Sequence, residues 1–314
     1  MPAWSSLLTL LAASAPQVLA SCAYGTHLHP RAEAGAFEEP KFGYNGIKGP
    51  VNWYSLDPAA NAMCATGKNQ SPINMAKGSF NLIPASEMTL EIPDFAEGAE
   101  FENLGTTVEV LAEEAGGGSL EIGEKSYELK QFHFHLPSEH LDNGTSMAME
   151  MHMVWQTAEQ EIAVIGVYID LDDGAASSAK SHYGRGSRGK AEKRSALEPR
   201  QSAATPSTLL ETVLGSVDKI ATPGATTHTE PLAMSELVKL LTSGSFQSYA
   251  GSLTTPPCSE GVRWLVSNKK VSIKTSTYLK ARSVIGFNAR YPQNAPGEEN
   301  LLQLAADAED EHDD

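Results

Sequence analysis

Two strand-like segments, residues 131–135 and 147–154, constrain this chain more than any other feature. Side chains of a β-strand alternate between two faces, so His133 and His135 point one way while the phenylalanines beside them point the other way. The second segment alternates in the same manner, with methionine at every odd position and His152 on the even face. If the two strands lie in one sheet, three imidazoles converge on one point.

Three histidines with an open fourth position form the usual ligand set of a catalytic zinc ion. A lone His-x-His pair can simply lie on a half-exposed sheet face, so the pair alone is weak evidence. The neighbours strengthen the case, because Gln131 shares the face of His133 and Glu150 shares the face of His152. Metal-bound histidines usually donate their second ring N–H to such acceptors. The pattern therefore favours a metal site over packing alone.

Further motifs follow one another in a consistent order along the chain. They are Phe42-Gly43-Tyr44, Gly49-Pro50-Val51-Asn52-Trp53, Gln70-Ser71-Pro72-Ile73-Asn74, His133-Phe134-His135-Leu136-Pro137-Ser138-Glu139-His140, Glu150-Met151-His152, Ser252-Leu253-Thr254-Thr255-Pro256-Pro257, Val262-Arg263-Trp264 and Asn288-Ala289-Arg290. With these motifs the chain resembles the α-class carbonic anhydrases, from about residue 42 to about residue 293. The Pro-Ser-Glu-His form resembles the bacterial and fungal members more than the vertebrate ones.

The resemblance implies a β-dominated α+β fold, a single domain built around a large, twisted, mostly antiparallel sheet with a few surface helices. The 314 residues, 41% of them hydrophobic, are ample for one core of this kind. We expect a signal peptide over residues 1–20, the carbonic anhydrase domain over 37–300 with a basic insert at about 174–206, and an acidic tail over 301–314.

The resemblance also implies the activity and the site residues. A zinc ion on the three histidines would lower the pKa of bound water to about 7, an effect for which this family is itself the standard example. The substrates would be carbon dioxide and bicarbonate, and sulfonamides and anions would inhibit. The implied site residues are Thr254 and Glu139 to orient the attacking oxygen, Thr255 to contact bicarbonate, Tyr44 in the solvent network, Gln131, Glu150 and Asn288 behind the zinc ligands, and Val154, Val164, Leu253 and Trp264 as the apolar wall for carbon dioxide.

Other functions remain open at this point. A non-catalytic relative serving in binding or storage would typically lack a zinc histidine, whereas all three are present. A secreted zinc esterase could use the same site. A Ser/His/acid triad at residues 138–140 is disfavoured, because triad members rarely adjoin in sequence; His140 fits a buried hydrogen-bonding role. The oligomeric state also stays open.

One position departs from the family pattern. Fast members carry a histidine after a glycine at the cavity rim, where it passes protons to solvent, and this segment aligns with Gly105-Thr106-Thr107. Threonine does not titrate near neutral pH, whereas histidine has an ordinary pKa of about 6.5. We therefore expect proton transfer to limit turnover.

The N-terminus reads as a secretory signal peptide, with an apolar run from Leu7 and a small-residue cleavage pattern at Ala20, although it lacks a positive N-region. The run is too short to span a membrane. Residues 19–22, ending in Cys22, also resemble a bacterial lipoprotein site. We expect a secreted protein.

In extracellular relatives the positions of Cys64 and Cys258 form a disulfide, so the resemblance implies that pair here. Two buried free thiols are the alternative, which an oxidising compartment disfavours. Two glycosylation triplets occur, at Asn69 and Asn143. Asn69 adjoins a core motif, so Asn143 is the better candidate.

Residues 174–206 differ in composition from the rest, with seven Lys/Arg and two Asp/Glu in a chain of net charge −16. With Tyr183 as the only aromatic residue there, nucleic-acid binding is disfavoured and a disordered surface loop is expected. The dibasic pair Lys193-Arg194 is a candidate cleavage site. The acidic end, residues 307–314, reads as a solvated tail without the apolar stretch of a lipid anchor.

Two helices are predicted from apolar periodicity. One follows Pro206-Ser207 and carries a stripe from Leu209 to Val217. The other is expected to be capped by Ser235 and to end at Gly244. Residues 262–266 alternate as a strand.

Overall fold

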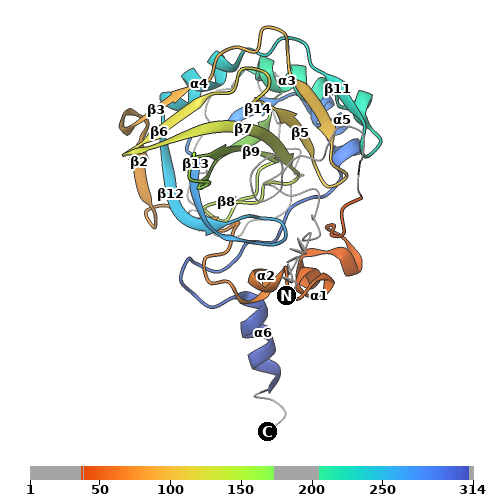
Figure 1. Ribbon diagram of the computed structural model, residues 1–314, viewed down its shortest axis with the longest axis vertical. Coiled ribbons are helices and arrows are strands. Elements are labelled where there is room, and N and C mark those ends of the chain that lie inside the picture. The colour runs from red at the N-terminus through yellow and green to blue at the C-terminus, as the bar shows by residue number, and fades with distance from the viewer. Residues whose placement is uncertain (1–36, 38, 173–204, 311–314) are drawn as a thin grey trace, which may run out of the picture.

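One large sheet dominates the computed structural model, which describes residues 37, 39–172 and 205–310 (Figure 1). Twelve of the strands form this sheet. They are β2 (Asn81–Pro84), β3 (Met88–Glu91), β4 (Glu100–Asn103), β5 (Val108–Leu111), β6 (Ser119–Ile122), β7 (Lys125–His135), β9 (Met149–Gln156), β10 (Ile162–Leu171), β11 (Thr226–His228), β12 (Ser245–Ser252), β13 (Glu260–Ser267) and β14 (Val271–Ile273). A separate pair joins β1 (Asn74–Met75) to β8 (Leu141–Asp142).

The main path of the sheet runs β11-β4-β5-β7-β9-β10-β13-β12-β2. Its pairs are antiparallel except where β10 meets β13 and β14, and the small β1–β8 pair is also parallel. The predicted large, mostly antiparallel sheet is confirmed. Strands β7 and β9 lie in the middle of the path, which places the histidine segments at the centre of the fold.

The register of β7 and β9 sets the histidine face. His133 lies opposite His152, with Gln131 opposite Val154 and His135 opposite Glu150. The phenylalanines of β7 and the methionines of β9 point the other way, into the main hydrophobic core. The alternation predicted from the sequence is confirmed, and it separates an apolar face from a face that carries the polar site.

A β-bulge precedes the histidines on β7. The pairing with β9 passes from Leu129–Trp155 to Gln131–Val154 and skips Lys130. An extra residue of this kind changes which face the following side chains occupy. Lys130 itself is held at the surface by Glu113 and Glu128, with nitrogen–oxygen distances of 2.7 and 3.1 Å.

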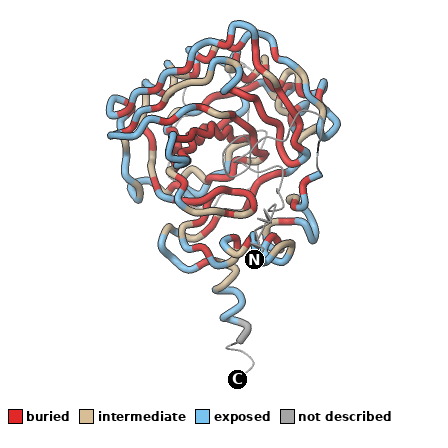
Figure 2. The backbone as a smooth tube through the Cα atoms, viewed as in Figure 1, coloured by how far each residue is buried: buried red, intermediate tan, exposed pale blue. Residues whose placement is uncertain are grey.

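Six α-helices lie around the sheet in the described part of the chain. They are α1 (Trp53–Leu56), α2 (Ala62–Thr66), α3 (Thr208–Gly215), α4 (Met234–Thr242), α5 (Thr275–Ile285) and α6 (Leu301–Asp310), with short 3₁₀ turns at Gly46–Lys48, Pro50–Asn52, Ala85–Glu87 and Val217–Ile220. Figure 2 shows the buried residues concentrated along the central strands, with exposed residues at the rim and on α6. No helix among these described residues is long and apolar enough to cross a membrane.

The helix α3 agrees with the sequence prediction. Leu209, Leu210, Val213 and Leu214 are buried in the main core. The hydroxyl of Ser207 accepts from the backbone N–H of Leu210 at 3.4 Å, which caps the helix as Ser at this position commonly does.

The predicted cap of α4 is wrong. The N-cap residue is Ala233, which makes no side-chain cap bond, and Ser235 lies inside the first turn. The backbone N–H of Ser235 instead donates to Oδ1 of Asp94 at 2.8 Å. A carboxylate distant in sequence therefore satisfies this helix end, which local pattern reading does not reveal.

The C-terminal segment begins as a helix. The acidic tail expected over residues 301–314 includes the helix α6, which projects from the body beside α2 (Figure 1). The side chain of Asn300 holds its start by donating to the carbonyls of Cys64 and Gly67, at 3.4 and 3.0 Å. The proposed signal peptide, Cys22 and nearly all of the 174–206 insert lie outside the described residues.

The two ends of the insert meet neighbouring residues of β14. The N–H of Asp172 donates to the carbonyl of Ile273 at 2.9 Å, and the N–H of Ser207 donates to the carbonyl of Ser272 at 2.8 Å. Backbone hydrogen bonds to one strand therefore hold the chain on both sides of the insert.

Candidate metal centre

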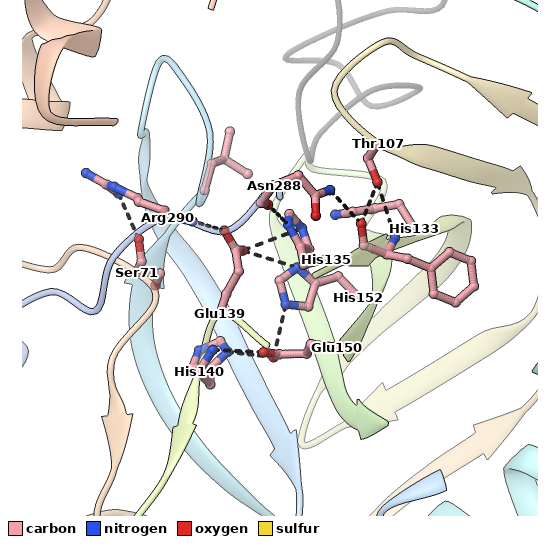
Figure 3. Close-up of polar contacts among 12 residues, drawn as sticks. Ser71, Thr107, His133, His135, Glu139, His140, Glu150, His152, Asn288 and Arg290 are labelled. Carbon is pink, nitrogen blue, oxygen red and sulfur yellow. Dashed lines mark hydrogen bonds and ion pairs between the residues drawn. The ribbon is translucent and has the colours of Figure 1, made fainter. Parts of the chain in front are cut away.

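Three buried histidines meet where β7 and β9 face each other. His133 and His135 come from β7 and His152 from β9, and all three side chains are buried. One nitrogen from each lies within 4.8 Å of the other two. Figure 3 shows the rings turned toward a common point. The structure therefore brings together the three predicted metal ligands.

The outer nitrogen of each histidine has its own acceptor. Nδ1 of His133 lies 2.8 Å from Oε1 of Gln131. Nε2 of His152 lies 3.0 Å from Oε1 of Glu150. Each of these contacts requires a protonated outer nitrogen, which fixes the tautomer and leaves the inner nitrogen as a lone-pair donor.

The third acceptor is a backbone group. Nδ1 of His135 donates to the carbonyl oxygen of Asn288 at 2.8 Å. The Asn288 side chain accepts from the N–H of Leu136 and donates to the carbonyls of Phe134 and Thr106, at 2.7, 2.9 and 3.1 Å. Asn288, predicted to support a zinc ligand, therefore contacts His135. It does so through its backbone carbonyl, which any residue at this position would also carry.

The inner nitrogens show that the site fits a metal ion. Nε2 of His133 and Nδ1 of His152 are buried with no hydrogen-bond partner among the described residues. Nε2 of His135 lies 3.5 Å from Oε2 of Glu139. Buried polar atoms without partners are costly, and a cation on the nitrogen lone pairs would satisfy them. Histidine nitrogen is a preferred zinc ligand, so the donor set matches.

Burial keeps the three imidazoles neutral. It lowers the pKa of His133 well below its ordinary value and the pKa of His135 to about 4, and it also lowers that of His152. The charges of neighbouring histidines add to this effect for His133. Neutral imidazole is the form that binds a metal, so the unprotonated state is in place at neutral pH.

A second group, His140 with Glu150 and His152, lies close enough together to hold a metal. Its bonds favour a structural role instead. Nδ1 of His140 donates to Oε1 of Glu150 at 2.7 Å, and the His140 backbone N–H donates to Oε2 at 2.8 Å. Both ring nitrogens of His140 are engaged, since Nε2 accepts from the hydroxyl of Tyr249 at 2.7 Å.

This hydrogen-bond chain continues away from the metal centre. The hydroxyls of Tyr249 and Ser71 are 2.8 Å apart, and Oγ of Ser71 accepts from the N–H of Ser252 at 3.0 Å. Burial raises the pKa of Tyr249, so its hydroxyl stays protonated as a donor. Sequence reasoning missed Tyr249, because no local motif marks its position on β12.

Glu139 lies next to the histidines. Its Oε1 accepts from the backbone N–H of Arg290 at 2.8 Å, and the side chain of Thr254 also bonds to it. Burial raises the pKa of Glu139 to about 7, against the opposing effects of His152, Arg290 and Thr254. The structure brings the predicted pair Glu139 and Thr254 together.

Arg290 supports this corner of the site, a role that sequence reasoning did not assign. Its guanidinium donates to the carbonyl of Ser71 at 2.8 Å (Figure 3). It also donates to Oε1 of Gln70 at 3.0 Å and to the carbonyl of Cys64 at 3.3 Å, and it lies over the ring of Trp53. Burial lowers its pKa to about 10, so it remains charged at neutral pH. The available signal was its place in the motif 288–290.

The predicted apolar wall lies on the histidine face. Val154, Val164, Leu253 and Trp264 belong to one buried cluster on that side of the sheet. The ring of Trp264 is 4.8 Å from that of His152, between centroids, and its Nε1 donates to the carbonyl of Ser252 at 2.9 Å. An apolar surface therefore adjoins the candidate metal ligands.

A disulfide joins Cys64 to Cys258, as the resemblance implied. The backbone N–H of Cys258 donates to the carbonyl of Thr255 at 2.9 Å. The bond thus links α2 to the loop that carries Thr254 and Thr255, both of which are buried.

Tyr44 and Thr106 both line a cavity of about 570 Å³ that also contacts Asn288. Tyr44 packs edge-on against Phe42 and Trp53. The cavity therefore reaches Asn288, whose carbonyl holds His135, although none of the three histidines is among its lining residues.

The two candidate glycosylation sites differ in environment. Asn143 is exposed in the turn after β8. The side-chain amide of Asn69 donates to Oε2 of Glu260 at 3.3 Å, and its backbone N–H donates to Oε1 at 2.7 Å.

Comparison with known proteins gives a consistent family. The sequence profile described as "Eukaryotic-type carbonic anhydrase" matches residues 48–182 and 197–300. A carbonic anhydrase of Neisseria gonorrhoeae is 30% identical over 288 residues, which are 91% of this chain and 92% of that protein.

Solved structures agree. The fungal α-carbonic anhydrase of Aspergillus oryzae is 36% identical with a TM-score of 0.71, over 84% of this chain and 98% of that one. The α-carbonic anhydrase of Thermovibrio ammonificans, in complex with the inhibitor sulfanilamide, is 30% identical with a TM-score of 0.64, over 85% and 99% of the two chains.

Proposed function

We propose that His133, His135 and His152 hold a catalytic zinc ion, because the chain belongs to the family of eukaryotic-type carbonic anhydrases. The protein is a carbonic anhydrase, which reversibly hydrates carbon dioxide to bicarbonate and a proton. The observation that carries this proposal is the pattern of the histidine nitrogens. Nε2 of His133 and Nδ1 of His152 are buried without partners among the described residues, while every outer nitrogen is bonded. When bound, zinc would make water acidic enough to ionise near pH 7, and carbonic anhydrase is the standard example.

Glu139 and Thr254 would orient the oxygen that attacks carbon dioxide. The backbone N–H of Arg290 holds the Glu139 carboxylate, which accepts the hydroxyl proton of Thr254. The Thr254 oxygen can then only accept a hydrogen bond from the attacking group. That group is thereby turned so that a lone pair faces the substrate, which is a positioning effect.

The apolar wall would receive carbon dioxide, which carries no charge and little polarity. Val154, Val164, Leu253 and Trp264 offer no hydrogen-bonding group on their packed faces beside His152, apart from the Trp264 N–H that Ser252 already satisfies. Thr255, next to Thr254, would contact the bicarbonate product.

Zinc content and carbon dioxide hydration test this assignment together. Purified protein should contain one zinc ion per chain, and stopped-flow hydration should be inhibited by an aromatic sulfonamide. Zinc without hydration would indicate a non-catalytic binding or storage protein. Ester hydrolysis without hydration would indicate a zinc esterase. Absence of bound zinc after growth in zinc-supplied medium would refute the ligand set.

The protein would act outside the cell. The signal-like N-terminus and the Cys64–Cys258 disulfide support this proposal, since disulfides persist in oxidising compartments. Expression with the natural N-terminus in a secreting host should release mature protein that begins after Ala20. Retention of the intact N-terminus inside the cell would contradict it.

Asn143 would carry an N-linked glycan. Its exposed turn leaves the surroundings open to a bulky sugar, whereas the Asn69 amide is engaged with Glu260. Endoglycosidase treatment of the secreted protein should lower its mass, and Asn143→Gln should remove that mass difference. A glycan that persists in Asn143→Gln would place the modification elsewhere.

A further inference from the structure

A glycine on β10 faces the carboxylate that holds His152. Gly166 lies directly opposite His152 in the β9–β10 register, on the face that also carries Glu150. A methyl group at this position would lie 2.9 Å from Oε1 of Glu150. Its other neighbours, Cζ3 of Trp264 and Cγ2 of Val266, would be 3.7 Å away, which is ordinary contact. The close approach therefore concerns one atom.

That atom has little freedom to move. Oε1 of Glu150 is shared by Nδ1 of His140 at 2.7 Å and Nε2 of His152 at 3.0 Å. The second oxygen accepts from the backbone N–H of His140 at 2.8 Å. A carbon atom at 2.9 Å would push the carboxylate away from β10, and the longer bond, to His152, is the weaker of the two that Oε1 makes.

The backbone does not require glycine here. Gly166 lies within a regular strand and not in the left-handed region that other residues avoid. Glycine inside a strand usually weakens it, and one common reason for its presence is the close approach of another group. At Gly166 the approaching group is the Glu150 carboxylate.

We propose that Gly166 is a positioning residue for the reaction: by leaving space for the Glu150 carboxylate, it keeps that group bonded to His152 and so fixes the tautomer and orientation of this zinc ligand. The inference rests on the proposed zinc site. Hydrogen-bond partners behind metal ligands usually orient those ligands. Gly166 would contribute to this orientation although it has no side chain.

The test compares Gly166→Ala with Gly215→Ala. Gly215 ends α3, and a methyl group there would meet nothing within 4 Å. Zinc affinity and release rate are measured by chelator competition, and folding by circular dichroism. Gly166→Ala should bind zinc about 10–100-fold more weakly, as loss of an outer partner commonly does, while Gly215→Ala should match the wild type. A folded Gly166→Ala protein with wild-type zinc affinity would overturn the proposal.

A double-variant cycle identifies the atom responsible. Glu150→Asp withdraws the carboxylate from the space beside Gly166, so Gly166→Ala should add little further loss in that background. If Gly166→Ala fails to fold, rescue of folding by Glu150→Asp would support the steric conflict with the carboxylate. Failure of the double variant to fold, or full additivity, would place the conflict elsewhere and refute the role.

A zinc-independent measurement separates this inference from the proposed function. In zinc-free protein, the exchangeable Nε2–H proton of His152 should give a protected NMR signal through its bond to Glu150, and Gly166→Ala should weaken or shift that signal. An unchanged signal would refute the role of Gly166 alone. Wild-type protein that binds no zinc would refute the zinc site while leaving this test intact.

Discussion

His133 and His152 are direct partners across β7 and β9, and their ring centroids lie 5.3 Å apart. Their outer nitrogens are bonded to Gln131 and Glu150, each two residues earlier on the same strand and face. Each strand thus carries a ligand together with the group that orients it. Because both strands lie in the middle of the sheet, the ligand positions depend on regular backbone and not on loops.

Replacing a ligand should abolish zinc binding. We expect His152→Ala to lose hydration activity and most zinc affinity, because two nitrogens remain and the Glu150 carboxylate loses a partner. Gln131→Ala should be milder, about 10–100-fold in affinity or activity. His228→Ala, at an exposed edge strand, serves as the control and should be unchanged. Metal analysis after dialysis checks this; full zinc content in His152→Ala would contradict it.

Zinc-free protein should lose stability on acidification. The unfolded chain protonates His135 near its ordinary pKa of 6.5, whereas the folded chain resists protonation until about pH 4. The unfolded state therefore binds more protons in this window, so stability falls as the pH is lowered from 6.5 toward 4, by about 3 kcal/mol at most from His135. The raised pKa of Glu139 opposes this trend, and the lowered values of His133 and His152 add to it.

Urea unfolding at several pH values measures this dependence. Zinc-free His135→Ala should show a smaller loss than zinc-free wild type over the same range. Equal pH dependence of the two proteins would show that His135 does not titrate as its burial requires.

Removing the disulfide should destabilise the protein and loosen the loop at Thr254. Cys64 and Cys258 are 194 residues apart, and closing so long a loop stabilises by about 5 kcal/mol at most on chain-entropy grounds. The double variant Cys64→Ser/Cys258→Ser should unfold at lower urea concentration and lose hydration activity. A reductant should impose the same loss on the wild type and none on the variant. Free thiols at both positions in secreted protein would remove the basis of this prediction.

Introducing a proton acceptor at Thr106 should raise turnover. Threonine cannot titrate near neutral pH, and the adjoining cavity of about 570 Å³ leaves room for an imidazole. Thr106→His should increase kcat at low buffer concentration with little change in kcat/KM. Added imidazole should raise kcat of the wild type but not of the variant. A high wild-type kcat that is indifferent to buffer would point to another proton path.

Proteolysis within residues 174–206, near Lys193-Arg194, should leave an active, associated two-fragment protein. Asp172 and Ser207, which flank the cut, are both hydrogen-bonded to β14, so cleavage between them need not move either end. Size exclusion should show the two fragments eluting together with retained hydration activity. Loss of activity at the first cut would assign the insert to the folded domain.

Sequence reasoning succeeded where chemistry is local. The alternation of side chains places His133, His135 and His152 on one face, and the acceptors Gln131 and Glu150 lie within two residues of their ligands. These contacts depend on strand geometry that residue order alone specifies. The family resemblance predicted the pairing of Glu139 with Thr254, which residue spacing does not indicate.

Contacts between distant segments could not be predicted in this way. Arg290 reaches Glu139 through a backbone N–H, which carries no sequence signature. The same holds for the Asn288 carbonyl and for Asp94, which satisfies the start of α4 in place of Ser235. No sequence pattern marks Gly166 either, because its role depends on which carboxylate the sheet register brings close to it.

The bulge at Lys130 changes which residues of β7, the odd-numbered or the even-numbered ones, face the main core. Before it the odd-numbered residues, Tyr127 and Leu129, point into the main core; after it the even-numbered ones, Phe132 and Phe134, do so. Deletion of Lys130 alone would leave a regular ladder in which Leu129 and Phe132 still face the core and the histidines keep the metal face, whereas pairing the whole present sequence without a bulge would direct the histidines into the apolar interior. The metal face of this strand is therefore set by a residue count, and an enzyme of this design should tolerate deletion of the unpaired Lys130 better than insertion of one further residue between Leu129 and His133.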